Sequence, residues 1–279
     1  MDKKNLILDR LGFAYSSSPN TPVFESLSAE ILLSSTTVIF GANASGKTTL
    51  ARLIGALDEP ASGAILWPPV AKDQSDVEKK VGVVFENPRF QLQAFTVKEE
   101  LEAGLIYQGL ARPEERNLAL ESVGAELGLE KLFNENIHEL EVSEQLAVLT
   151  AAFLILRPRL LVLDFSLTLF ESSFRDKFLS FIRKNNSPGL VVFTRHAEDL
   201  ALAGSGSTAF LLEDGLLKEL PFEGENELEA VETLRKAHIR MPWYLDLSLL
   251  LYREKRLDRI IYKSDKDFVR DYEKLKKEV

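Results

Sequence analysis

The sequence contains no cysteine and only three histidines among its 279 residues. Without cysteine the chain can form no disulfide and offers no thiolate ligands for zinc or an iron–sulfur cluster. The histidines, His138, His196 and His238, are too few to favour a histidine-based metal site. The lack of cysteine is consistent with a cytoplasmic protein.

Long hydrophobic stretches are also missing. The longest apolar run, roughly 146–156, ends at Arg157, Pro158 and Arg159, well short of the ~20 residues that a membrane-spanning helix needs. The first residues, MDKKNLILDRLGFAY, are too polar for a signal peptide. We therefore expect any membrane association to go through a partner.

Basic residues are fewer than acidic ones. The chain has 34 Lys and Arg against 43 Asp and Glu, a formal net charge of -9. This balance argues against a nucleic-acid-binding protein, which usually needs a basic face. A hydrophobic content of 45% indicates a globular protein with a core, and the length suits one large α/β domain with an appendage or two modest domains.

Short apolar segments alternate with helical ones through most of the chain. The segments 36–40, 81–85, 160–163, 190–194 and 209–212 are typical of buried strands, and 47–57, 143–156 and 174–184 have helical spacing. Such alternation predicts an α/β fold with a mostly parallel sheet and helices on its faces. The segments 5–15, 27–33 and 64–67 read as further strands. The stretch 97–132 is mostly helical, with a break near 109–113, and from about 221 onward the sequence is helical and charge-rich.

A glycine-containing loop joins the strand 36–40 to the helix that follows. Residues 41–48, GANASGKT, match the P-loop pattern G-x-x-x-x-G-K-[ST]. In such a loop, backbone amides and the helix N-terminus cradle phosphates, the lysine reaches the β- and γ-phosphates, and the hydroxyl ligates Mg²⁺. The motif predicts binding of ATP and Mg²⁺. The residues assigned to the nucleotide are Gly41, Asn43, Ala44, Ser45, Gly46, Lys47, Thr48 and Thr49, with Thr48 also on the metal.

An acid ends the apolar strand LLVLD at Asp164. Many strands end in aspartate, but together with the upstream P-loop this one fits the Walker B pattern, whose carboxylate holds Mg²⁺. Asp164 is the second predicted metal residue.

Residues 81–100, VGVVFENPRFQLQAFTVKEE, carry a longer and more specific pattern. With the P-loop and Walker B segments, the chain resembles ABC ATPases, and most of all the ATP-binding subunits of energy-coupling factor importers for cobalt and vitamins. The tail resembles these subunits too, with Met241-Pro242 followed by Leu245 and Leu249. The resemblance therefore covers nearly the whole chain.

The resemblance implies a P-loop NTPase of ABC type, with an antiparallel N-terminal β part beside the parallel sheet. We expect an ATP-binding domain at 1–220, with a helical subdomain at about 97–156, and a small C-terminal helical region at 221–279. The family's adenine-stacking position falls on Tyr15, which could instead be an ordinary core residue. Glu86 takes the glutamine position that senses Mg²⁺, and His196 takes the switch histidine position; these two are the predicted catalytic residues.

The chain departs from the family where hydrolysis is carried out. The family's catalytic glutamate is replaced by Phe165, which cannot accept a proton. General-base assistance is worth about 10²–10⁴-fold in rate. The signature LSGGQ falls on 140–144, LEVSE, where Glu141 sets a negative charge at the expected phosphate site; the segment could also be a plain helix cap. The residue before His196 is Arg195 rather than the usual threonine, and Glu171 takes the position of the D-loop acid.

Two functional hypotheses follow. In the first, the chain is an importer ATPase subunit that couples Mg-ATP binding, with slow or partner-dependent hydrolysis, to transport of a vitamin or metal ion. In the second, it is an inactive nucleotide-binding scaffold for a partner ATPase. A small-molecule kinase is disfavoured because no arginine cluster follows the P-loop. The family's sites are composite, so a heterodimer with an intact ATPase subunit is favoured over a homodimer. We also expect a transmembrane partner that holds the chain at the inner face of the cell membrane.

Overall fold

The computed structural model describes residues 5–68, 81–107, 109–110, 112–185, 188–204, 206–222, 227–257 and 265–275. Parts of the predicted C-terminal region, 223–226, 258–264 and 276–279, therefore lie outside the described residues. The strands are β1 Asn5–Phe13, β2 Phe24–Leu32, β3 Thr36–Phe40, β4 Ser62–Leu66, β5 Val81–Phe85, β6 Leu160–Asp164, β7 Gly189–Thr194, β8 Thr208–Glu213 and β9 Leu216–Glu219. The α-helices are α1 Lys47–Ile54, α2 Val97–Tyr107, α3 Pro113–Leu127, α4 Val142–Leu154, α5 Ser172–Asn185, α6 Glu198–Ala203, α7 Glu227–Lys236, α8 Trp243–Arg253 and α9 Asp265–Leu275.

Two sheets organise the molecule. The larger has the strand order β5-β6-β7-β3-β8-β9, and only the β8–β9 pair within it is antiparallel. The smaller has the order β2-β1-β4 and is antiparallel. The prediction of a mostly parallel sheet beside an antiparallel N-terminal part is confirmed.

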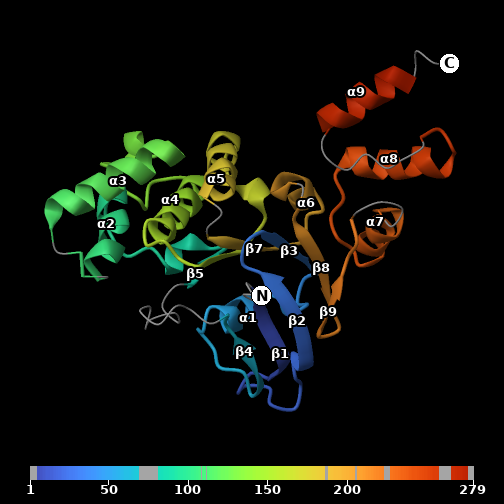
Figure 1. The fold of residues 1–279 in the computed structure, drawn as a ribbon, viewed down its shortest axis with the longest axis horizontal. Helices are drawn as coiled ribbons and strands as arrows, with labels where there is room; N and C mark the ends of the chain where they lie inside the picture. Colours follow the sequence, from blue (N-terminus) through green and yellow to red (C-terminus); the bar gives the residue numbers. More distant parts are fainter. Residues whose placement is uncertain are drawn as a thin grey trace.

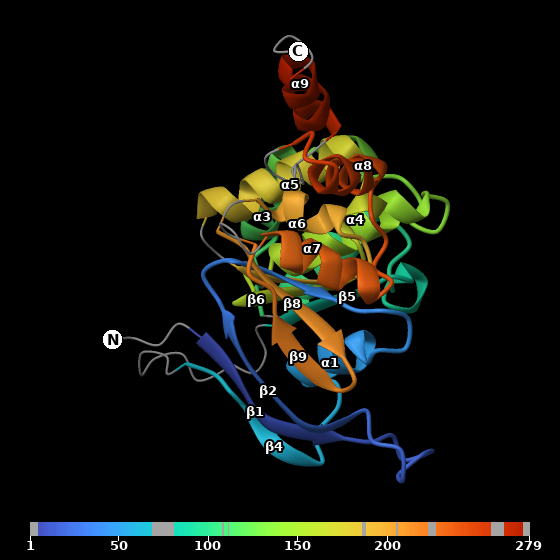
Figure 2. The ribbon, with the colours of Figure 1, turned by 90° about the vertical axis from the view of Figure 1, so that its right-hand side faces the viewer.

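Helix α1 lies between the two sheets, as Figures 1 and 2 show. Its buried Leu50 and Leu53 share a hydrophobic cluster with Leu8 of the small sheet and with Val162 and Phe193 of the large one. Each Å² of apolar surface removed from water stabilises the fold by about 25 cal/mol. The packing of this layer therefore fixes the start of α1 relative to the strand ends. The P-loop is thereby held between two rigid layers.

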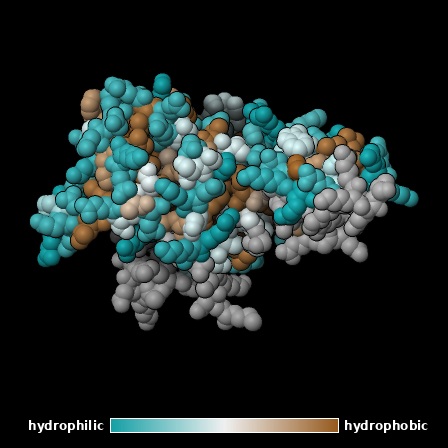
Figure 3. Space-filling model, turned by 90° about the horizontal axis from the view of Figure 1, so that it is seen from above, coloured by the Kyte–Doolittle hydropathy of each residue, from teal (hydrophilic) through white to brown (hydrophobic). Residues whose placement is uncertain are grey.

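A second cluster joins the other face of the large sheet to helices α2–α5, which gather on one side of the molecule in Figure 1. A third joins the C-terminal helices to the sheet, with Val231, Leu234 and Leu249 packed in the same cluster as Val38 and Leu211. Seen from above, hydrophilic residues cover most of the surface, with hydrophobic ones scattered between them (Figure 3). Within the described residues, no helix combines the length and the apolar character needed to span a bilayer.

Most predicted elements are present with small shifts at their ends. The strands at 36–40 and 81–85 match to the residue, and the predicted break near 109–113 separates α2 from α3. Helix α1 ends at Ile54, before Gly55, three residues earlier than predicted. The sequence missed α6 and β9, which have six and four residues and are too short to give a periodic signal. In the turn before β9, Asp214 and Gly215 have φ of 50° and 73°, as a tight hairpin requires.

Candidate nucleotide-binding site

The candidate residues meet at the carboxyl ends of the parallel strands. Strand β3 leads into the loop 41–46, β6 ends at Asp164, β7 ends just before Arg195 and His196, and β5 ends just before Glu86. Parallel strands place their carboxyl ends along one edge, where ligands bind in α/β sheets. Because Phe85 pairs with Asp164 in parallel, Glu86 lies just beyond the end of β5, beside the end of β6.

The loop before α1 is shaped by backbone conformation. Ala44 and Gly46 have φ of 61° and 98°, in the left-handed region that glycine adopts most easily. A Cβ at Gly46 would also come within 2.9 Å of both Phe24 and Val23. The first amides of a helix have no acceptor within that helix, so α1 presents free N–H groups at this loop. The loop and helix together form a site suited to an anion.

Lys47 folds back over its own loop. Its Nζ donates to the carbonyl oxygens of Gly41 at 2.8 Å and Ala42 at 2.6 Å. Burial lowers the pKa of Lys47, while the nearby Asp164 carboxylate raises it. The ammonium is thus held at the mouth of the loop by two neutral acceptors, which an anionic phosphate can replace.

Thr48 and Asp164 are 116 residues apart in sequence and form a hydrogen bond. The Thr48 Oγ1 donates to Asp164 Oδ2 at 2.6 Å. Burial raises the pKa of Asp164 to about 6, against the lowering effects of the Thr48 hydrogen bond and the Lys47 charge. The predicted pairing of these two residues at one place is therefore present in the fold.

The oxygens of Thr48, Asp164 and Glu86 suit Mg²⁺, which prefers hard oxygen ligands and keeps several waters. Among the described residues, no three or more His, Cys, Asp or Glu side chains are grouped so that they could hold a metal ion. The donor set is compatible with Mg²⁺ bound together with a nucleotide.

Tyr15 lies beside the start of α1. Its hydroxyl forms a hydrogen bond of 2.8 Å with the hydroxyl of buried Thr49, and its ring meets Phe13 edge-on. The side chain is still 41% exposed. Tyr15 is therefore not an ordinary core residue, and part of its side chain is open to solvent beside the P-loop helix.

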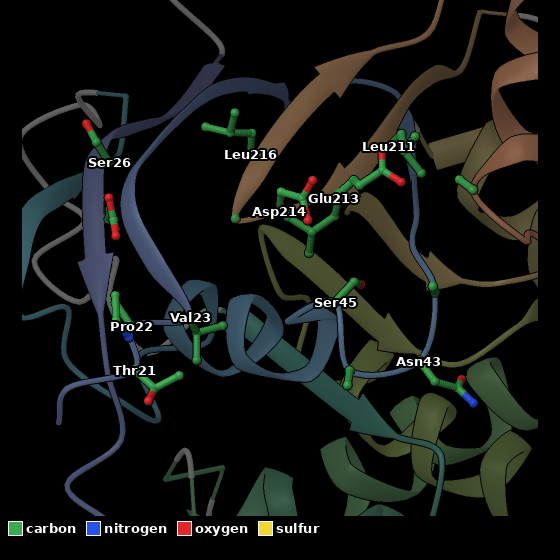
Figure 4. Close-up of a pocket in the computed structure, with 16 residues that line it drawn as sticks. Thr21, Pro22, Val23, Ser26, Asn43, Ser45, Leu211, Glu213, Asp214 and Leu216 are labelled. Atoms are coloured by element: carbon green, nitrogen blue, oxygen red, sulfur yellow. The ribbon is translucent and has the colours of Figure 1, made fainter. Parts of the chain in front are cut away.

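The pocket beside the loop differs in character from the phosphate site. About 790 Å³ in volume, it is lined by 42–45, by the segment leading into β2 and by the β8–β9 turn (Figure 4). Neither Lys47 nor Thr48 lines it, and Glu25, Glu213 and Asp214 do. These carboxylates would repel a polyphosphate. The side chains of Lys47 and Thr48 therefore lie outside this pocket.

Phe165 packs away from the nucleotide side. Its side chain is 3% exposed, and its ring lies edge-on to Phe170, which in turn contacts Phe174 and Phe178. Glu171 accepts hydrogen bonds from Ser173 and Ser172 at the start of α5, and these bonds lower its pKa. The side chain at position 165 itself therefore offers no proton acceptor.

The segment 140–144 forms the start of α4. The amide of Glu141 donates to Glu144 Oε2 at 3.0 Å, and Gln145 N–H donates to the Glu141 carbonyl at 2.9 Å. The Glu141–Glu144 bond belongs to a capping box, which stabilises a helix N-terminus, and the Gln145–Glu141 bond is an ordinary backbone bond of the helix. The prediction that this segment serves as a helix cap is confirmed.

His196 is half-buried, and its amide donates to Thr194 Oγ1 at 3.0 Å. Burial lowers its pKa, and the charges of Arg240 and Arg195 lower it further. Nearby, Asp199 is fully buried and accepts hydrogen bonds from Ser166 Oγ and the Leu167 amide. Sequence reasoning gave Asp199 no role; its only signal was the pattern H-x-x-D-L. The hydrogen bonds of Asp199 connect the loop after β6 to α6.

Comparison with known proteins gives consistent results. The family profile described as "ABC transporter" matches residues 24–166. An energy-coupling factor transporter ATP-binding protein EcfA1 of Halalkalibacterium halodurans is 27% identical over 258 residues, covering 89% of this chain and 90% of its own length. The EcfA protein of Methanocaldococcus jannaschii is 27% identical over 244 residues, covering 85% and 86%.

Solved structures are similar in fold. CbiO1 from Clostridium perfringens, part of the ABC transporter complex cbiONQ, superposes with a TM-score of 0.65 at 20% identity, covering 89% of this chain and 96% of its own. The ABC cassette MJ0796 bound to ADP and Pi also gives 0.65 at 20% identity, covering 78% and 99%.

Proposed function

Because this chain belongs to the ABC transporter family of ATP-binding domains, we propose that it is the ATP-binding subunit of an energy-coupling factor type importer. The observation that carries the proposal is the P-loop brought against the Walker B acid, with Thr48 and Asp164 2.6 Å apart. The energy-coupling factor assignment is supported by relatives that match along most of both chains. The VFENP segment at 84–88 agrees with it.

In this proposal the nucleotide phosphates lie on the amides of 41–48, with Lys47 between the β- and γ-phosphates. Tyr15 stacks on the adenine. Thr48 and Asp164 hold Mg²⁺, with Glu86 close to it; the bound cation would neutralise phosphate charge. His196 contacts the γ-phosphate as the switch residue. These roles are supported by the positions of the side chains at one edge of the sheet.

Hydrolysis by this chain is expected to be slow. Phe165 supplies no base, and the start of α4 at 140–144 places Glu141 where the family has a small residue. Two copies of the chain would form two defective sites, whereas a heterodimer with an intact ATPase subunit would combine intact parts from both chains. We therefore favour a heterodimer.

A groove between the nucleotide-binding core and the helical subdomain is the proposed docking site for a transmembrane subunit. It has a volume of about 430 Å³ and is lined by Glu86, Asn87, Pro88, Arg89 and Val142. Two large apolar side chains that closely follow these residues in the chain are exposed, Phe90 at 87% and Phe95 at 65%. Exposed apolar surface next to polar residues is typical of protein interfaces. Docking here would hold the chain at the cytoplasmic face of the membrane, and the transported vitamin or metal ion would be chosen by the membrane components.

One observation favours a second candidate function, a scaffold that binds nucleotide without turning it over. Phe165 belongs to the core rather than to the nucleotide site. In that case ATP binding by this chain stabilises the assembly, and its partner performs the hydrolysis.

The test is to measure nucleotide binding and turnover separately. The purified chain should bind Mg-ATP, and its steady-state hydrolysis should be lower than that of an intact ABC ATPase by about 10² or more. Hydrolysis should rise when an intact subunit and the membrane subunit are added. Turnover that stays at background in the full complex would support the scaffold, and absence of ATP binding would reject both functions.

A further inference from the structure

Arg195 stands next to the P-loop at the end of β7. Strands β3 and β7 pair in parallel, with Phe40 opposite Thr194, and the Gly41 amide donates to the Thr194 carbonyl at 3.0 Å. Gly41 and Arg195, the residues that follow β3 and β7, therefore begin their loops at the same level of the sheet. Thr194 is buried, whereas Arg195 is exposed at the strand edge.

The charge of Arg195 acts on two residues of the site. Its charge contributes to lowering the pKa of Lys47 and of His196, so it lies within electrostatic reach of both. In the described part of the chain, no carboxylate forms an ion pair with it and no side-chain hydrogen bond satisfies it. The carboxylates of Asp164 and Glu86 also act on Lys47, but the charges of Lys47 and Arg195 repel each other, and an anion bound between them would relieve that repulsion.

The main chain around Arg195 is held in place from a second side. The Arg240 amide donates to the Arg195 carbonyl at 2.7 Å, and the Ala197 amide donates to the Arg240 carbonyl at 2.9 Å. These bonds form a parallel bridge between His196 and Arg240. Together with the Gly41 bond they fix the backbone of residues 194–197, so the guanidinium projects from a preorganised base.

The position of Arg195 suits contact with the distal end of a bound polyphosphate. The amides at the start of α1 take the phosphates nearest to the nucleoside. The chain of phosphates then runs toward the ends of β6 and β7, where Asp164 and Arg195 lie. The Asp164 carboxylate is suited to binding the metal. The Arg195 guanidinium is suited to binding phosphate, because it can donate two parallel N–H hydrogen bonds to two phosphate oxygens.

We infer that Arg195 binds the γ-phosphate of ATP in the same subunit and makes this site select ATP over ADP. The inference rests on the proposed function, because it requires that the chain bind ATP at the P-loop. Arg195 would act as a specificity-determining residue. It holds the triphosphate in a site where Phe165 supplies no group for hydrolysis.

The experiment compares ATP and ADP affinities by equilibrium titration of the purified chain with each nucleotide and Mg²⁺. Arg195→Thr removes the guanidinium, Arg195→Lys keeps the charge without the planar fork, and Arg112→Thr makes the same charge change at a distant exposed site. We expect Arg195→Thr to weaken ATP binding about tenfold or more while ADP binding changes by less than about twofold. Arg195→Lys should lie in between, and Arg112→Thr should match the wild type.

Unchanged ADP affinity also shows that the variant is folded. The inference is overturned if Arg195→Thr weakens ATP and ADP equally, or leaves both unchanged, or strengthens ATP binding. If the wild-type chain binds neither nucleotide, the proposed function fails, and the inference fails with it. If the wild type binds both and the variants do not separate them, only the inference fails.

Discussion

The ring of Phe165 meets the ring of Phe170 edge-on, with centroids 5.3 Å apart and an interplanar angle of 85°. Phe165 directly follows the acid that pairs with Thr48, yet its side chain belongs to the core between the sheet and the helices. The residue at the family's catalytic position is thus a packing residue in this chain.

Replacing Phe165 tests this packing. The sequence alone predicts that Phe165→Glu restores a base and raises hydrolysis opposite an intact signature. The structure adds a cost, because the substitution removes aromatic contacts and sets a carboxylate among apolar rings. We expect Phe165→Glu to lower the free energy of unfolding by about 3 kcal/mol or more, and Phe165→Leu by about 1 kcal/mol. Urea unfolding at neutral pH measures both. Equal stability of the two variants would mean that the side chain at 165 turns toward the nucleotide.

Removal of the P-loop lysine should abolish most ATP affinity. Lys47 is the loop's ammonium group, held by the Gly41 and Ala42 carbonyls until phosphate replaces them. We expect Lys47→Ala to weaken ATP binding by about tenfold to a hundredfold, as for the loss of a charge-assisted hydrogen bond. The matched control is Lys218→Ala, an exposed lysine on β9. Identical ATP affinity in both variants would contradict nucleotide binding at this loop.

Tyr15 variants separate stacking from hydrogen bonding. Tyr15→Phe keeps the ring and loses the bond to Thr49, whereas Tyr15→Ala loses both. Because stacking of a base on an aromatic ring is worth about 1–3 kcal/mol, we expect Tyr15→Ala to weaken ATP and ADP binding about tenfold. Tyr15→Phe should stay close to the wild type. Inorganic tripolyphosphate has no base, and its affinity should be the same for all three proteins; a loss there would point to a damaged loop instead.

Reversal of one charge at the proposed docking groove should weaken assembly with the membrane subunit. Arg89 lines the groove and is exposed. In the co-expressed complex, Arg89→Glu should reduce the amount of membrane subunit that co-purifies, with ATP affinity unchanged. Arg112→Glu, on the helical subdomain away from the groove, serves as the control. Full recovery of the complex with Arg89→Glu would remove the groove as the docking site.

Asp199 should make stability depend on pH. Burial raises its pKa to about 7, against the lowering effect of its hydrogen bonds. Between about pH 4 and pH 7 the folded protein keeps this proton and the unfolded chain loses it. Stability from this group is therefore present at low pH and lost as the pH rises, by about 1.4 kcal/mol per pH unit. Asp199→Asn keeps an acceptor for Ser166 and Leu167 and has no such proton.

The measurement for Asp199 is the difference in free energy of unfolding between wild type and Asp199→Asn at pH 5, 6 and 7. We expect the wild type to lose stability relative to the variant across this range. A difference that does not change with pH would show that Asp199 is ionised in the folded protein.

The sequence by itself determined the local parts of this protein. The strand at 36–40, the loop at 41–46 and the helix after it are adjacent in the chain, so composition and spacing were enough to predict the P-loop. The strand ending at Asp164 was predictable for the same reason. The cap at the start of α4 could also be read locally, because its partners Glu141 and Glu144 are three residues apart.

Only the tertiary structure decided how these parts meet. Strand β3 pairs with β7 and β8, which lie more than 140 residues further along the chain, and this pairing sets Arg195 beside Gly41. The bridge from Arg240 to His196 and the inward packing of Phe165 likewise depend on contacts between distant segments. Periodicity reports which face of an element is buried, but not which element covers it. That choice follows from the long-range packing of the whole sheet.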